Sequence, residues 1–320
     1  MQWLALIGAL ALAQTQAPLV FPSSAELVHV VVSVTDTNGM PVAGLQAKDF
    51  SVSEDGMPRS VATFAACGDI STVTATECPV DLVFLWDTST SMLDNLRRAR
   101  DAAVRFAEKV PAANGRMVVA FDARIRVSTY DPSHPGATFD ALLSGEMGGA
   151  TRLFDAIREG IDRATNDPTR RVIMLALTDG EDSGAYTRPN FAAKVLAQAA
   201  PGNFSEVIQS EPVNDVAAAL QREGVTFYAI GFSSQLLHED RQKHANETLR
   251  TLAKATGGFV VDGESGDMDS QFDAIRRDLS TQYILGFVPG TSAPGRSHKI
   301  RIQIATKDVK VRHRLSYQSR

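Results

Sequence analysis

Five side chains with oxygen donors stand in three separate segments of the sequence. Asp87, Ser89 and Ser91 alternate within DTSTS, Thr151 lies in the glycine-rich segment GGATRLFDA, and Asp179 lies in LTDGED. Alternate side chains of an extended chain point the same way, so the first three donors can face one point. Oxygen donors without imidazole or thiolate select Mg²⁺, Ca²⁺ or Mn²⁺ over zinc or copper. These residue types predict a site for a hard divalent cation.

Each of the three segments borders a predicted strand or helix. Asp87 ends the apolar strand PVDLVFLWD, Asp179 ends RRVIMLALTD, and Thr151 precedes the amphipathic helix RLFDAIREGIDRAT. Strands and helices alternate over residues 79–280, which is typical of a mostly parallel α/β sheet with helices on both faces. Ligands of such sheets bind at the carboxyl ends of the strands. We therefore expect the five donors to meet at one sheet edge.

The segment that follows DTSTS predicts the first helix of this region. In LDNLRRARDAAVRFAEKV the apolar residues recur at helical spacing, and we expect them to face the sheet: Leu96, Ala99, Ala103, Phe106 and Val110.

The flanks of this region are rich in strand signals. Residues 24–66 and 281–320 combine β-branched residues with Gly and Pro turns, and KIRIQI alternates strictly, which indicates a half-exposed strand. Neither flank is large enough to bury a core of its own. We expect the two flanks to pair into one small β-sandwich, with residues 79–280 inserted between them.

Each oxygen donor also has an ordinary structural explanation. Ser89, Ser91 or Thr151 could cap the helix that follows it. Asp179, which precedes a glycine, could be a turn residue. Each alternative is the commoner one for a single residue, but the agreement of three separate segments favours the metal site.

Together the three segments resemble the metal-ion-dependent adhesion site of von Willebrand factor A domains, in order and in approximate separation, over residues 79–280. The resemblance implies a doubly wound sheet with one Mg²⁺ at its top, Mn²⁺ or Ca²⁺ being the other ions that fit. It implies these ligands: Asp87, Ser89, Ser91, Thr151 and Asp179. In the family the hydroxyls tend to bind directly, the aspartates often act through water, and a vacant metal position accepts a partner's carboxylate.

The flanks are similar to those of bacterial proteins called VWFA-related, which are exported and abundant in acidobacteria and other soil bacteria. The segments that carry this resemblance are VVSVTDTNGMPVAGLQAKDFSVSEDGMPRSVATF before the α/β region and STQYILGFVPG, HKIRIQI and VKVRHRLSY after it. The resemblance implies an exported protein, in the periplasm, on the cell surface or secreted.

The first residues also predict export. Residues 3–13 form an apolar run that is too short to span a bilayer, and Ala11, Leu12 and Ala13 form a plausible cleavage site. We expect a signal peptide within residues 1–17, the alternative being an apolar first helix of the fold. No other stretch of the sequence reaches membrane length, so the mature chain is expected to have no membrane span.

The two cysteines, Cys67 and Cys78, stand 11 positions apart among polar turn residues. An even number of cysteines in an exported chain predicts one disulfide between them, and two free thiols are the alternative.

The composition excludes some classes of partner. Of the 320 residues, 44% are hydrophobic and 22% are charged, which is typical of a soluble globular protein. The formal net charge of −5 argues against nucleic acid or an anionic membrane as the main partner.

The main enzymatic alternative is a Mg²⁺-dependent phosphotransferase of the haloacid dehalogenase type. Such an enzyme needs a second aspartate two positions after the first as its general acid, and this chain has Ser89 there. A serine hydrolase is disfavoured because no G-x-S-x-G elbow occurs and none of the six histidines has a partner recognisable in the sequence. A Mg²⁺ with neutral ligands and no adjacent base is also poorly suited to hydrolysis.

We therefore predict a non-enzymatic module that captures a Glu or Asp carboxylate of a protein partner through its metal. A purely structural role in assembly, in which the metal only holds loops together, is the third possibility.

Overall fold

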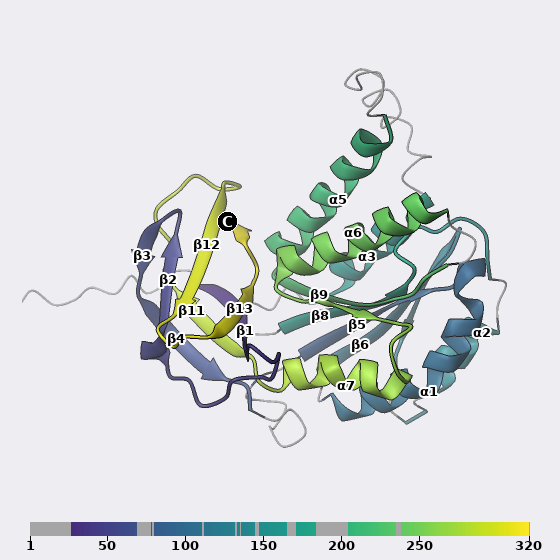
Figure 1. Ribbon diagram of the computed structural model, residues 1–320, viewed down its shortest axis with the longest axis horizontal. Coiled ribbons are helices and arrows are strands. Elements are labelled where there is room, and N and C mark those ends of the chain that lie inside the picture. The colour runs from purple at the N-terminus through teal and green to yellow at the C-terminus, as the bar shows by residue number, and fades with distance from the viewer. Residues whose placement is uncertain are drawn as a thin grey trace, which may run out of the picture.

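Two parts of the chain lie side by side in the computed structural model (Figure 1). One part is a central sheet with helices on both faces, and the other consists of strands. The described residues are 27–68, 78, 80–110, 112–131, 133–134, 136–144, 147–164, 171–183, 204–234 and 238–319. The signal peptide predicted within residues 1–17 lies outside them. Within the described residues no helix combines the length and apolar character needed to cross a membrane.

The central sheet has the order β10-β9-β8-β5-β6-β7. Its strands are β5 (Val80–Asp87), β6 (Ala112–Phe121), β7 (Ile125–Thr129), β8 (Arg171–Thr178), β9 (Val225–Gly231) and β10 (Val260–Asp262). All neighbours are parallel except β6 and β7, which are antiparallel. The mostly parallel α/β architecture predicted from the alternation of strands and helices is confirmed.

Helices cover both faces of this sheet (Figure 1). Along β5, Leu82, Phe84 and Trp86 face one core layer, and Val83 and Leu85 face the other. The first layer is completed by α1 (Leu93–Lys109), α2 (Ala137–Leu143) and α7 (Met268–Leu279). The second is completed by α3 (Leu153–Arg163), α5 (Phe204–Arg222) and α6 (Glu239–Thr256). Burial on both faces explains why β5 reads as a continuous apolar run.

The helical spacing after DTSTS correctly identifies the face of α1 that packs on the sheet. All five residues expected to be buried are at most 3% exposed: Leu96, Ala99, Ala103, Phe106 and Val110.

The two flanks pair with each other. In one antiparallel sheet, β1 (Val28–Asp36) pairs with β11 (Tyr283–Phe287) and β13 (Val309–His313), and β4 (Val61–Ala66) pairs with β11. In the second, β12 (Ser297–Ile304) pairs with β2 (Phe50–Glu54) and β14 (Ser316–Gln318), and β3 (Met57–Arg59) pairs with β2. The short 3₁₀ helix η1 (Ala47–Asp49) precedes β2.

One apolar core lies between these two sheets, with contributions from both flanks. In β12, Ile300 and Ile302 are buried while Arg301 between them is exposed, as the alternation of KIRIQI predicts. The expectation that the α/β region is inserted between flanks that form one β-sandwich is confirmed.

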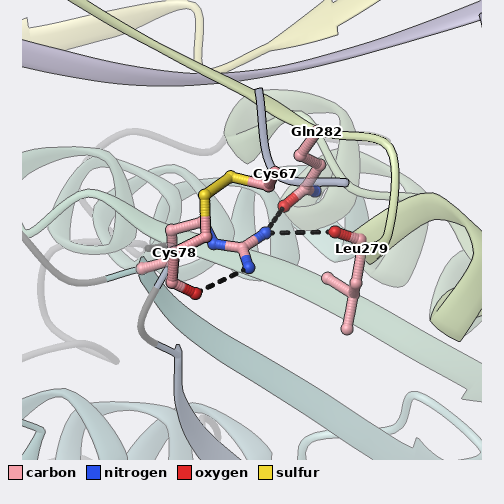
Figure 2. The surroundings of a disulfide bond; sticks show 5 residues. Cys67, Cys78, Leu279 and Gln282 are labelled. Atoms are coloured by element: carbon pink, nitrogen blue, oxygen red, sulfur yellow. Dashed lines mark hydrogen bonds between the residues drawn. A yellow bond between two sulfur atoms is a disulfide. The ribbon is translucent and has the colours of Figure 1, made fainter. Parts of the chain in front are cut away.

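The two connections between the parts are tied together at one place (Figure 2). Cys67, after β4, forms the predicted disulfide with Cys78, before β5. The backbone N–H of Cys67 donates to the carbonyl of Gln282, which lies between α7 and β11 (2.8 Å). Arg171, at the start of β8, donates to the carbonyls of Cys78 (3.0 Å) and Leu279 (3.2 Å) and to Oε1 of Gln282 (2.6 Å). We call these five residues the clasp.

Charged and polar groups continue the clasp into the sandwich. Asp278 of α7 accepts hydrogen bonds from Ser33 of β1 (3.0 Å), from Tyr228 of β9 (2.7 Å) and from the guanidinium of Arg312 of β13. Burial lowers the pKa of Arg171 to about 10, so its side chain remains a cation at neutral pH. The junction is thus a polar, hydrogen-bonded contact.

Candidate metal centre

Asp87 lies at the carboxyl end of β5 with both carboxylate oxygens engaged. The register that pairs Trp86 with Leu177 places the end of β5 beside Thr178, the last residue of β8. The hydroxyl of Thr178 donates to Oδ2 of Asp87 (2.6 Å), and the backbone N–H of Ser89 donates to Oδ1 (3.0 Å). Asp87 is completely buried, so the backbone and Thr178 determine its orientation.

The two serines and Asp179 form a contact between the loops that follow β5 and β8. The hydroxyl of Ser91 donates to Oδ2 of Asp179 (2.7 Å), and the hydroxyl oxygens of Ser89 and Ser91 lie 3.2 Å apart. The chain turns into the 3₁₀ helix η2 (Thr90–Met92) after Ser89, so the segment is not extended throughout as expected. The predicted hydroxyls nevertheless lie together because the turn brings Ser91 back over Ser89.

Thr151 belongs to a third loop, which is bonded to the other two. Its backbone N–H donates to the hydroxyl of Ser183 in the loop after β8 (2.7 Å). The N–H of Gly148, three residues earlier, donates to the carbonyl of Thr88 (3.0 Å). Gly148 has a φ of 107°, and a Cβ there would lie 2.9 Å from the hydroxyl of Thr90, so this close approach requires glycine. The three segments therefore meet at one sheet edge.

The structure also decides the capping alternatives. The N-cap of α1 is Met92 and that of α3 is Arg152, so neither Ser91 nor Thr151 occupies a cap position. Ser89 precedes η2, but its side chain makes no capping hydrogen bond. Asp179 does accept the N–H of Glu181 as a turn residue would (3.1 Å), yet it does so with Oδ1 while Oδ2 contacts Ser91.

The electrostatics of the site favour a bound cation. Burial, together with the charge of Asp179, raises the pKa of Asp87 to about 7, and burial also raises the pKa of Asp179. The two buried carboxylates repel each other, and a bound divalent ion would remove that repulsion. Among the described residues, no group of three or more His, Cys, Asp or Glu is arranged so that it could hold a metal ion by itself, and the proposed donors here are three hydroxyls and two carboxylates. These donors fit a hard divalent ion.

Three supporting residues were not identified from the sequence: Thr178, Ser183 and Asp122. Asp122 follows β6 and is buried, and its Oδ2 accepts the hydroxyl of Thr88 (2.9 Å) and the guanidinium of Arg126 (2.8 Å). This pairing holds Thr88, between the predicted ligands Asp87 and Ser89, away from the site. The sequence does indicate Asp122, because this residue ends the strand RMVVAFD just as Asp87 and Asp179 end their strands.

A second polar cluster lies in the sandwich. The ring of His298 makes hydrogen bonds with Oδ2 of Asp55 (2.9 Å) and with the hydroxyl of Ser292 (2.9 Å), which is the order of groups in a serine hydrolase. The sequence offered no partner for any histidine, and the structure provides two for this one. Oδ1 of Asp55 accepts the N–H of Lys299, and the ring of His298 stacks on Tyr317. We assign the cluster to anchoring the connection between β11 and β12.

Comparison with known proteins identifies the family. The family model described as von Willebrand factor type A domain matches residues 81–277. No protein of curated function matches the sequence.

Several solved structures are similar in fold at low identity. An aerotolerance-related membrane protein from Bacteroides fragilis is 16% identical with a TM-score of 0.41, covering 62% of this chain and 98% of its own. Proximal thread matrix protein 1 from the mussel byssus, solved with a zinc-occupied MIDAS motif, is 14% identical with a TM-score of 0.45, covering 70% and 49%. A von Willebrand factor type A protein from Catenulispora acidiphila is 11% identical with a TM-score of 0.38, covering 93% and 75%.

The family assignment rests on the sequence match, which covers more than half of the chain and contains all five predicted metal ligands. This chain therefore belongs to the von Willebrand factor type A domain family.

Proposed function

We propose that this protein is a non-enzymatic binding module, in which a divalent metal at the carboxyl edge of the central sheet captures a carboxylate of a protein partner. The observation that carries the proposal is the contact between Ser91 and Asp179 (2.7 Å), which joins two of the three predicted ligand segments. Backbone hydrogen bonds from Gly148 and Thr151 bring the third segment to the same edge.

The proposed ligands are Asp87, Ser89, Ser91, Thr151 and Asp179. Mg²⁺ is the proposed ion, and Mn²⁺ or Ca²⁺ would also suit these oxygen donors. The bound metal would supply an electrophilic position. Because three of the five ligands are neutral hydroxyls, the ion would keep a strong attraction for an incoming anion.

Two observations favour binding over catalysis at this site. Position 89 carries a serine where a phosphotransferase of the haloacid dehalogenase type would need its general acid. Asp87, the residue that would be the nucleophile, is completely buried with hydrogen bonds to both of its oxygens. A nucleophile must reach the substrate, and Asp87 is buried with both oxygens already hydrogen-bonded.

We further propose that the chain consists of a signal peptide within residues 1–17, a β-rich flank over 24–66, the inserted domain over 79–280 and a second flank over 281–320. The disulfide between Cys67 and Cys78 supports an oxidising compartment, the periplasm, the cell surface or the extracellular space. The likeness of the flanks to exported bacterial VWFA-related proteins remains a prediction.

The proposal is tested first on the purified protein with metal alone. We expect Mg²⁺ and Mn²⁺ to bind at one site by calorimetry, and we expect Ser89→Ala and Thr151→Ala each to weaken binding at least tenfold, since each removes a proposed direct ligand. Thr90→Ala is the matched control, because Thr90 is an exposed hydroxyl within the same segment. Unchanged affinity in both ligand variants would exclude this site as the metal centre.

The second step concerns the partner. Capture of a partner from the native organism should require the metal, stop on addition of chelator, and be lost in Ser89→Ala but not in Thr90→Ala. If Ser89→Ala lowers only the melting temperature and leaves capture intact, the metal serves to hold loops together and the binding surface lies elsewhere. Mg²⁺-dependent turnover of a generic phosphate ester that disappears in Asp87→Asn would establish an enzyme instead.

A further inference from the structure

An ion pair that the sequence did not predict lies beside the candidate metal centre. Glu181, in the loop after β8, forms a salt bridge with Arg241 near the start of α6. The Glu181 side chain is 19% exposed and that of Arg241 is 48% exposed, so the pair is partly in contact with solvent. Neither residue belongs to the proposed ligand set.

The pair is coupled to a proposed ligand through the backbone. The N–H of Glu181 donates to Oδ1 of Asp179 (3.1 Å), so the acid of the pair belongs to the same turn as the ligand. Gly180 between them has a φ of 82°, and a Cβ there would lie 2.7 Å from the carbonyl of Ala245 in α6. The loop after β8 is therefore seated directly on the helix that carries Arg241.

The charge of Arg241 also lies close to the site. Its guanidinium is paired with Glu181, whose backbone N–H is bonded to Oδ1 of Asp179. A fixed cation near a metal site weakens cation binding by Coulomb repulsion, and a neighbouring carboxylate offsets that repulsion.

Resting on the proposed function, we propose that the Glu181–Arg241 pair sets the affinity of the centre for its metal, with each residue balancing the other. Loss of Arg241 alone leaves the Glu181 carboxylate unbalanced next to Asp179 and strengthens metal binding. Loss of Glu181 alone leaves the guanidinium unbalanced and weakens it. Loss of both restores the net charge of the native pair.

The test uses Mn²⁺ alone as the probe, titrated by calorimetry at low ionic strength. We expect Arg241→Gln to lower the dissociation constant roughly threefold to tenfold, Glu181→Gln to raise it by a similar factor, and the double variant to bind within about twofold of the native protein. The differences should shrink in high salt, because exposed charges are screened.

Two controls separate this electrostatic role from a structural one. Arg241→Lys keeps the charge and should bind Mn²⁺ like the native protein. Arg250→Gln removes an exposed cation further along the same helix and should have little effect. Circular dichroism and the melting temperature of each variant establish that it is folded.

Each remaining outcome contradicts the inference in a recognisable way. Weaker binding in both single variants would mean that the pair only braces the loop. Unchanged binding in both would mean that its charge does not reach the metal. If the native protein binds no Mn²⁺, the proposed function fails together with the inference, whereas the first two outcomes leave the proposed function standing.

Discussion

At the scale of single residues, the hydrogen bond from Thr178 to Asp87 connects folding with the site. A buried carboxylate without a donor has a large free-energy cost, and Thr178 supplies one donor from the neighbouring strand. The same bond orients Asp87 at the point where the loops after β5 and β8 meet. A residue outside the proposed ligand set thus helps to place one of the proposed ligands.

We predict that Thr178→Val lowers the free energy of unfolding by about 1 to 3 kcal/mol, because the substitution leaves Oδ2 of Asp87 buried without its donor. It should also weaken Mn²⁺ binding, since Asp87 is then free to turn. Urea denaturation and calorimetry measure the two effects. Thr90→Val, at an exposed threonine, is the matched control, and equal stability of the two variants would contradict the assignment.

The five proposed donors could be selected from the sequence because their residue types and spacings are local features, and their role as ligands stays a prediction. The residues that position these donors could not be predicted from the sequence, with one exception. The contact of Thr178 with Asp87 depends on the register of β5 and β8, whose residues are far apart in the chain, and that of Ser183 with Thr151 depends on how two loops pack. Asp122 is the exception, since its place at a strand end could have been recognised.

At the scale of elements, hydrophobic periodicity predicts most strands, but it does not indicate where the chain changes the strand with which it pairs. Within the run VKVRHRLSY, the first part, β13, pairs with β1 and the last part, β14, pairs with β12 of the other sheet. Between them the N–H of Leu315 bonds to the carbonyl of Ala255 in α6. A strand that passes from one sheet to the other keeps its alternation of buried and exposed residues, so the sequence pattern does not indicate where it crosses. The short elements β7 and α2 were also not expected.

The connection between β11 and β12 gives a prediction at this scale. If Ser292 and His298 only anchor this connection, Ser292→Ala should lower the free energy of unfolding by about 1 kcal/mol, the typical net contribution of one hydrogen bond. A fluorophosphonate probe should leave Ser292 of the native protein unmodified. Labelling of Ser292 that is lost in His298→Gln would instead identify a reactive serine.

At the scale of the whole molecule, the clasp joins the inserted domain to the sandwich. Arg171 is buried and donates to three acceptors that belong to both connections. Removal of one partner from a buried polar network leaves the others unsatisfied. We therefore expect Arg171 to contribute far more to the free energy of unfolding than an exposed arginine does.

We predict that Arg171→Met lowers the free energy of unfolding by about 3 kcal/mol and that thermal unfolding separates into two calorimetric transitions, one for each part of the molecule. Arg163→Met is the matched control, because Arg163 is exposed and is paired with Glu159 of the same helix. Such surface pairs contribute about 1 kcal/mol or less. A single, unshifted transition in Arg171→Met would show that the two parts are coupled by other contacts.

The clasp also determines how the molecule would carry mechanical load. Both β5 and β8 start at the clasp and end at the candidate metal centre, and they are paired from Val80 and Arg171 to Trp86 and Leu177. A pull between a captured partner and the sandwich would therefore run lengthwise along these two strands. In that direction the covalent backbones of both strands carry the tension in parallel, so transmitting the load does not require the hydrogen bonds between them to break.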